Sequence, residues 1–69
     1  MKLDLHGVKH ADVSKELDMF LFEHMQNNVL QVEVITGKSI TMKKIVRKLL
    51  PEYDLEVSSE LEGSLIIDL

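Results

Sequence analysis

Cysteine and tryptophan are missing from this 69-residue sequence, and the aromatic residues are limited to two phenylalanines and one tyrosine. Without cysteine, neither a disulfide scaffold nor a cysteine-based zinc site can form, and the absence fits a reducing compartment. With so few aromatic side chains, base stacking should contribute little to any binding of nucleic acid. No apolar run reaches the length of a signal peptide or a membrane span. We therefore expect a soluble, cytoplasmic protein that does not enter a membrane.

The length allows a single domain, residues 1–69, without a repeat or a flexible linker. The formal net charge of -4 argues against a nucleic-acid coat over the whole surface. Charge is nevertheless unevenly distributed, because five of the eight basic residues fall within eleven positions and no acid interrupts them. These residues are Lys38, Lys43, Lys44, Arg47 and Lys48. One basic patch on an acidic body predicts a local site for a polyanion.

Hydrophobic periodicity predicts a strand, a helix and a second strand in the first half of the chain. Residues 3–5 alternate apolar and polar side chains, which indicates a short strand. A helix is expected from about His10 to about Asn27, with an apolar stripe of Val13, Leu17, Phe20, Leu21 and Met25. Residues 30–35 are rich in β-branched side chains and return to a period of two, which predicts a strand with Leu30, Val32 and Val34 facing the core.

The second half contains a predicted helix and a predicted hairpin. Ser39 or Thr41 can cap the helix, and Pro51 ends it because the residue before a proline disfavours helical angles. Residues 54–58 and 64–69 indicate two strands, and the glycine in the link between them favours an antiparallel hairpin. Right-handed crossovers place both helices on one side of the sheet. The predicted fold is α+β, a two-layer α/β sandwich in the order β-α-β-α-β-β with a mixed four-stranded sheet.

Asp4 and His6 are candidate catalytic residues at the end of the first predicted strand. They are two positions apart, so both side chains point away from the core where the chain turns at Gly7. Histidine titrates near neutral pH, and an adjacent carboxylate fixes its tautomer. The pair can thus act as proton carrier and orienting group. The alternative is an exposed Asp and His on a half-buried strand with no function.

Gly37, Lys38 and Ser39 are candidate phosphate-binding residues in the turn after the second predicted strand. If the first two strands are parallel, both turns lie at the edge of the sheet where ligands of such sheets bind. Gly37 would let a phosphate approach the backbone, and Lys38 would neutralise it. The helix behind the turn attracts anions through its free N–H groups. Its outward face adds four cations, which are Lys43, Lys44, Arg47 and Lys48.

These stretches resemble the Smr (small MutS-related) domain family over nearly the whole chain. Residues 3–7, Leu-Asp-Leu-His-Gly, are similar to its LDxHG signature, and residues 36–39, Thr-Gly-Lys-Ser, to its second motif, HGxG with TGxG as a variant. Ser39 stands where the family has its last glycine, and Lys9 where many members have a histidine. The resemblance implies a fold like the C-terminal domain of a bacterial translation initiation factor. It gives Asp4 and His6 the roles of the first motif, and Gly37 with Lys38 those of the second.

The resemblance also implies a nuclease or a nucleic-acid binder. Our leading hypothesis is an endonuclease that cleaves RNA or nicks structured DNA, and the alternative is a non-catalytic nucleic-acid or ribosome-binding module. A third hypothesis is a protein-interaction domain that pairs through Ile35 and Ile66 on the bare sheet face. We expect a monomer. One imidazole and one carboxylate fall short of a zinc site, while a loosely held magnesium ion that bridges Asp4 and a phosphate stays open.

Acidic side chains on the bare face of the predicted sheet would repel phosphates. They are Asp4, Glu33, either Asp54 or Glu56, and Asp68. Nucleic acid should therefore approach along the two turns and the second helix. Binding through phosphates predicts weak sequence preference and steep salt dependence.

Overall fold

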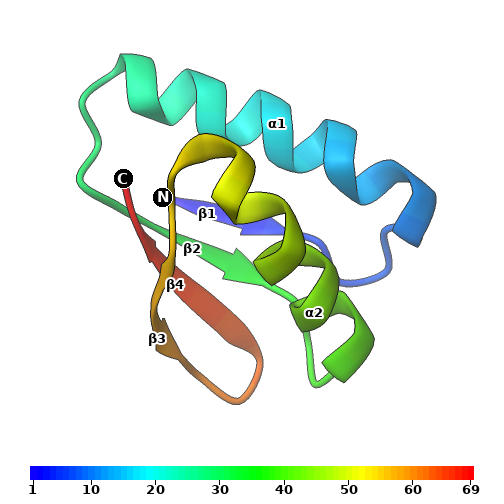
Figure 1. Cartoon of the computed structure of the whole chain (residues 1–69). Coiled ribbons are helices and arrows are strands. Elements are labelled where there is room, and N and C mark those ends of the chain that lie inside the picture. Colours follow the sequence, from blue (N-terminus) through cyan, green and yellow to red (C-terminus); the bar gives the residue numbers. More distant parts are fainter.

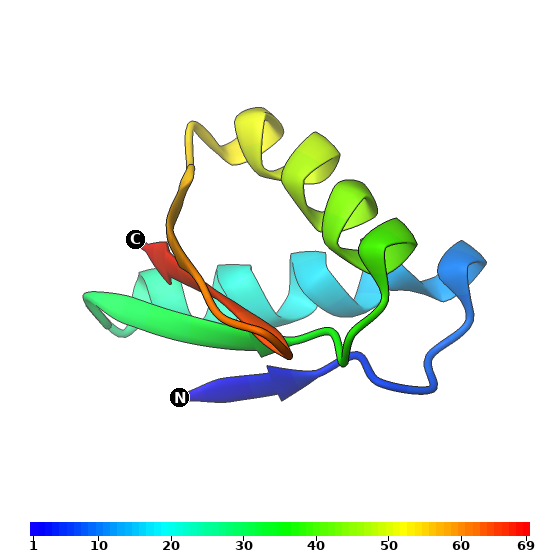
Figure 2. The ribbon, with the colours of Figure 1, turned by 90° about the horizontal axis from the view of Figure 1, so that it is seen from below.

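The computed structural model describes all residues, 1–69, and consists of a four-stranded sheet with both helices on one face (Figure 1, Figure 2). The elements are β1 (Lys2–Asp4), α1 (His10–Gln26), β2 (Gln31–Ile35), α2 (Ile40–Leu49), the 3-10 turn η1 (Leu50–Tyr53), β3 (Val57–Glu60) and β4 (Ser64–Asp68). β1 is parallel to β2, and β4 is antiparallel to both of its neighbours, in the order β1-β2-β4-β3. The predicted α+β sandwich is confirmed.

The hydrophobic core lies between the sheet and the two helices. The register pairs Val32 with Ile67 and Val34 with Leu65, so these four side chains share the face that the helices cover. The other buried apolar residues are Leu5, Val13, Leu17, Leu21, Met42, Val46, Leu50 and Leu55. No helix is both long enough and apolar enough to cross a membrane.

α1 buries one stripe, as its periodicity predicts. Leu17 and Leu21 are fully buried, and burying a leucine contributes about 1.5–3 kcal/mol relative to leaving it exposed. The prediction for Met25 is wrong, since this side chain is 42% exposed. Met25 lies in the last turn of α1 and lines a surface hollow with Leu30. Asn28, with φ of 57°, supplies the left-handed residue that ends the helical path.

All four strands differ from their predicted bounds. β1 (predicted 3–5) is shifted by one residue and β4 (predicted 64–69) ends one residue earlier, while the changes in β2 and β3 affect the side chains most. Leu30 is 82% exposed, because β2 begins one residue later and the alternation of faces applies only within the sheet. β3 begins at Val57, since η1 and the left-handed Asp54 (φ 58°) intervene, and it continues to Glu60. The hairpin link is therefore residues 61–63. Glu60 pairs with Leu65, whose side chain is buried beneath the helices, so the Glu60 side chain lies on the side of α2.

α2 starts at a side-chain cap and ends before the proline. Ser39 is the cap, because its Oγ accepts a hydrogen bond of 3.0 Å from the N–H of Met42. Such a cap contributes about 1 kcal/mol. The α-helix ends at Leu49, and Pro51 lies within η1, where the chain tightens by one more turn. The cap fixes the direction in which α2 leaves the turn at residues 36–39.

Candidate functional site

The turns that follow β1 and β2 lie side by side at one edge of the sheet, because the two strands are parallel (Figure 2). Gly37 has φ of +64°, and a Cβ atom built there would lie 3.2 Å from Cδ2 of His6. Any side chain at position 37 would therefore press on the imidazole. The structure thus brings together the two turns that the sequence placed 30 positions apart.

The hairpin link forms the third part of this edge. The carbonyl oxygen of Gly63 accepts hydrogen bonds of 3.0 Å from the N–H groups of both Thr36 and Gly37. We call the three adjoining loops, residues 5–9, 36–39 and 61–63, the rim. The sequence marked Gly63 only as a hairpin glycine, because no local signal says which distant loop a hairpin will touch.

Asp4 fixes the first turn through the main chain. Its Oδ1 accepts a 2.8 Å hydrogen bond from the backbone N–H of His6, and no hydrogen bond joins the carboxylate to the imidazole. Gly7, with φ of +84°, then redirects the chain. The exposed imidazole of His6 contacts the second turn, while the orienting role of Asp4 stays a prediction.

In the second turn, the free backbone N–H groups belong to Lys38 and Ser39 and not to Gly37. The N–H of Gly37 is bonded to Gly63, and the buried hydroxyl of Thr36 donates to the carbonyl of Gly37 at 2.8 Å. Neither Lys38 nor Ser39 donates its backbone N–H within the protein. The capacity to bind an anion therefore lies at Lys38 and Ser39, at the start of α2.

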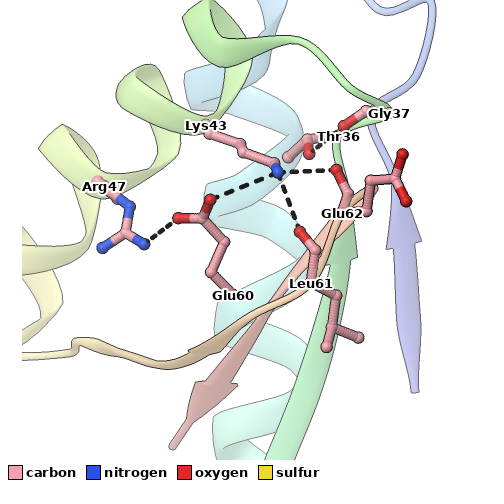
Figure 3. A network of polar contacts seen from close by, with 7 residues as sticks. All are labelled: Thr36, Gly37, Lys43, Arg47, Glu60, Leu61 and Glu62. Atoms are coloured by element: carbon pink, nitrogen blue, oxygen red, sulfur yellow. Dashed lines mark hydrogen bonds and ion pairs between the residues drawn. The ribbon is translucent and has the colours of Figure 1, made fainter.

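Lys43 is a structural residue in this arrangement (Figure 3). Its Nζ donates to the carbonyl oxygens of Leu61 (2.9 Å) and Glu62 (2.8 Å), and it lies 3.6 Å from Oε2 of Glu60. The side chain is only 13% exposed. Two of the three ammonium protons are donated to these carbonyl oxygens, and the Glu60 carboxylate competes with any phosphate for the third.

Arg47 and Lys38 also have carboxylate partners. Arg47 donates to Glu60, and this hydrogen bond is the largest cause that lowers the pKa of the Glu60 carboxyl, followed among the favourable contributions by the charge of Lys43. Lys38 Nζ lies 3.0 Å from Oε1 of Glu62. The hairpin thus supplies acids to three of the five predicted cations.

Lys44 and Lys48 are exposed and form no hydrogen bond or ion pair within the protein. They are one helical turn apart on α2, so their side chains lie on the same side of the helix. A hollow of about 300 Å³ is lined by Lys44 together with Ile40, Lys43, Arg47 and Glu60. Of the five predicted cations, these two have no acidic partner within the protein.

The largest hollow does not suit a polyanion. It has a volume of about 550 Å³ and is lined by Asp54, Glu56 and Asp68 among other residues and by no basic side chain. No three His, Asp or Glu side chains are placed to share a metal ion. Anion-binding groups therefore gather only at the rim and along α2.

Comparison with known proteins gives one match. The model of the Smr domain family matches residues 3–63 of the 69-residue chain. No curated protein and no solved structure matches. The matched residues contain both turns of the rim and the hairpin link. The chain therefore belongs to the Smr domain family, which comprises nucleic-acid-binding and nuclease-type modules.

Proposed function

We propose that this domain is an endonuclease that cleaves a phosphodiester bond of RNA or of structured DNA, with His6 as the residue that moves the proton. The observation that carries the proposal is the position of the His6 ring beside Gly37, where an added Cβ would lie 3.2 Å from Cδ2. A phosphate bound by the next two residues, Lys38 and Ser39, would lie beside the imidazole.

Three kinds of group support phosphate binding at the rim. The unpaired N–H groups of Lys38 and Ser39 stand at the positive end of the α2 dipole. The Lys38 ammonium is 82% exposed. Lys44 and Lys48 continue the positive charge along α2, so a nucleic-acid backbone can follow the helix away from the rim. Contacts of this kind read phosphates and not bases, so sequence preference should be weak.

The chemistry requires one proton transfer at each end of the reacting phosphate. A water oxygen attacks phosphorus while His6 accepts the water proton, and the bond from phosphorus to the leaving oxygen breaks. The leaving oxygen takes a proton from solvent. The N–H groups of Lys38 and Ser39 stabilise the charge that builds on the phosphate oxygens. Asp4 acts as a positioning residue, because its carboxylate holds the backbone of the His6 turn.

Substitution of His6 tests the proposal. His6→Ala should lower cleavage of a mixed panel of RNA and DNA substrates by about 10²- to 10⁴-fold, the usual contribution of general acid–base catalysis. Binding of the same substrates should be unchanged. His10→Ala is the matched control, since His10 is an exposed histidine in the first turn of α1. Each protein is assayed with and without a chelator, and equal cleavage by wild type and His6→Ala would remove the catalytic assignment.

One observation favours the alternative function, a non-catalytic nucleic-acid-binding module. The Asp4 carboxylate is bonded to a backbone N–H, so the imidazole has no acidic partner that orients it. Under this alternative the wild-type protein binds the substrate panel but cleaves none of it. The Gln substitution of Lys44 and Lys48 discriminates further, because the function of a binder weakens in proportion to its affinity, whereas an enzyme keeps its turnover at high substrate concentration.

A further inference from the structure

The hairpin link brings a carboxylate to Lys38, the cation of the second turn of the rim. Oε1 of Glu62 lies 3.0 Å from Nζ of Lys38, and the two side chains are 79% and 82% exposed. Exposed ion pairs of this kind are weak, so a phosphate can displace the carboxylate from the ammonium. The rim therefore holds a cation with its own competing anion.

Glu62 cannot move far from the phosphate position, because its backbone is tied down on both sides. Lys43 donates to the carbonyl oxygens of Leu61 and Glu62, and the next residue, Gly63, accepts the N–H groups of Thr36 and Gly37. The Glu62 side chain makes none of these contacts. A displaced carboxylate would thus remain close to any phosphate that replaces it.

We infer that Glu62 is a specificity-determining residue that prevents the rim from favouring the ends of a nucleic acid; this rests on the proposed function. An internal phosphodiester carries one negative charge, whereas a terminal phosphate carries about two above its second pKa near 6. With Glu62 present, the attraction of Lys38 and the repulsion of Glu62 both grow with the charge of the phosphate, so they cancel. Without Glu62, the attraction of Lys38 is no longer offset. The affinity for a doubly charged terminal phosphate then rises more than the affinity for an internal phosphodiester.

The test compares one short single-stranded oligonucleotide with and without a 5′-phosphate at pH 8. Binding to wild type, Glu62→Gln and Glu56→Gln is followed by fluorescence anisotropy at fixed low salt. Glu56→Gln is the matched control, because it removes one exposed carboxylate at the opposite end of β3. Thermal unfolding monitors the fold, which should persist since the substituted carboxylate makes no contact with Lys43.

Wild type and Glu56→Gln should show the same ratio between their affinities for the two oligonucleotides. Glu62→Gln should shift this ratio about threefold in favour of the phosphorylated one, the size expected for one exposed charge pair. If both variants bind but Glu62→Gln shows the same ratio between the two affinities as Glu56→Gln, the inference is overturned. The proposed function is unaffected by that result. No binding by any of the three proteins overturns the proposed function itself.

Discussion

Lys43 and Lys44 are adjacent in the sequence, but the two sides of α2 that carry them differ in what they contact. The hairpin side, Lys43 and Arg47, meets the acids and carbonyls of β3 and its link. The open side, Lys44 and Lys48, meets solvent. Basic residues that are neighbours on one helix can therefore have two different roles. Those on the hairpin side stabilise the fold, and those on the open side are available to bind an anionic ligand.

The largest expected effect is on the free energy of unfolding, which should respond to a substitution on the hairpin side but not to one on the open side. Lys43→Met should lower the free energy of unfolding by about 2 kcal/mol, because it leaves carbonyls without their charged donor. Lys44→Met should change it by less than about 0.5 kcal/mol, as is usual for exposed positions. Urea unfolding at neutral pH measures both. Equal losses for the two variants would contradict the distinction between the two sides.

Nucleic-acid binding should show the reverse pattern. Replacing Lys44 and Lys48 together with Gln should reduce the slope of log K against log salt by about 1.4 for single strands, because each phosphate contact contributes about 0.7. A control with Lys2 and Lys15 changed to Gln loses the same net charge away from α2. Titrations from 50 to 200 mM salt, a range that shows such slopes, measure the difference. A slope that falls equally in both double variants would mean that no phosphate path follows the open side.

The pH dependence of stability should be the smallest of these effects and should involve only the hairpin side. The Arg47 hydrogen bond and the Lys43 charge lower the pKa of Glu60 below 4.5 in the folded protein. A lowered folded pKa stabilises the fold above the unfolded pKa, and this contribution is lost as the pH falls through the folded value. Urea unfolding midpoints between pH 6 and 3 should therefore decline less in Glu60→Gln than in wild type. An identical decline in both proteins would show that the Glu60 carboxylate does not contribute to the pH dependence of stability.

Several features of the fold could be predicted because they depend on neighbours in the sequence. The periodicity of residues 13–21 specifies the buried stripe of α1, and Ser39 acts as a cap because its Oγ needs to reach an N–H only three residues away. Two failures in the predicted core have a common cause. Leu30 and Met25 are apolar and in phase with their elements, yet each lies at an end that the opposite layer does not cover.

The candidate site was predictable in its turns but not in its charges. The glycines at positions 7 and 37 have positive φ, which local sequence signals well. Nothing near Lys43 or Lys38 in the sequence shows that Glu60 and Glu62 will face them. That pairing depends on the placement of β3 at the edge of the sheet beside β4, beneath α2.

By itself the sequence determined the order of the elements, the helix cap and the two glycine turns, since each depends on contacts within a few residues. Only the tertiary structure decided which cations remain free. Ion pairing depends on distance in space, and the parallel pairing of β1 with β2 and the hairpin of β3 with β4 bring three distant loops together at the rim. The same lysine-rich helix would have presented all of its charge to solvent if the hairpin had packed elsewhere.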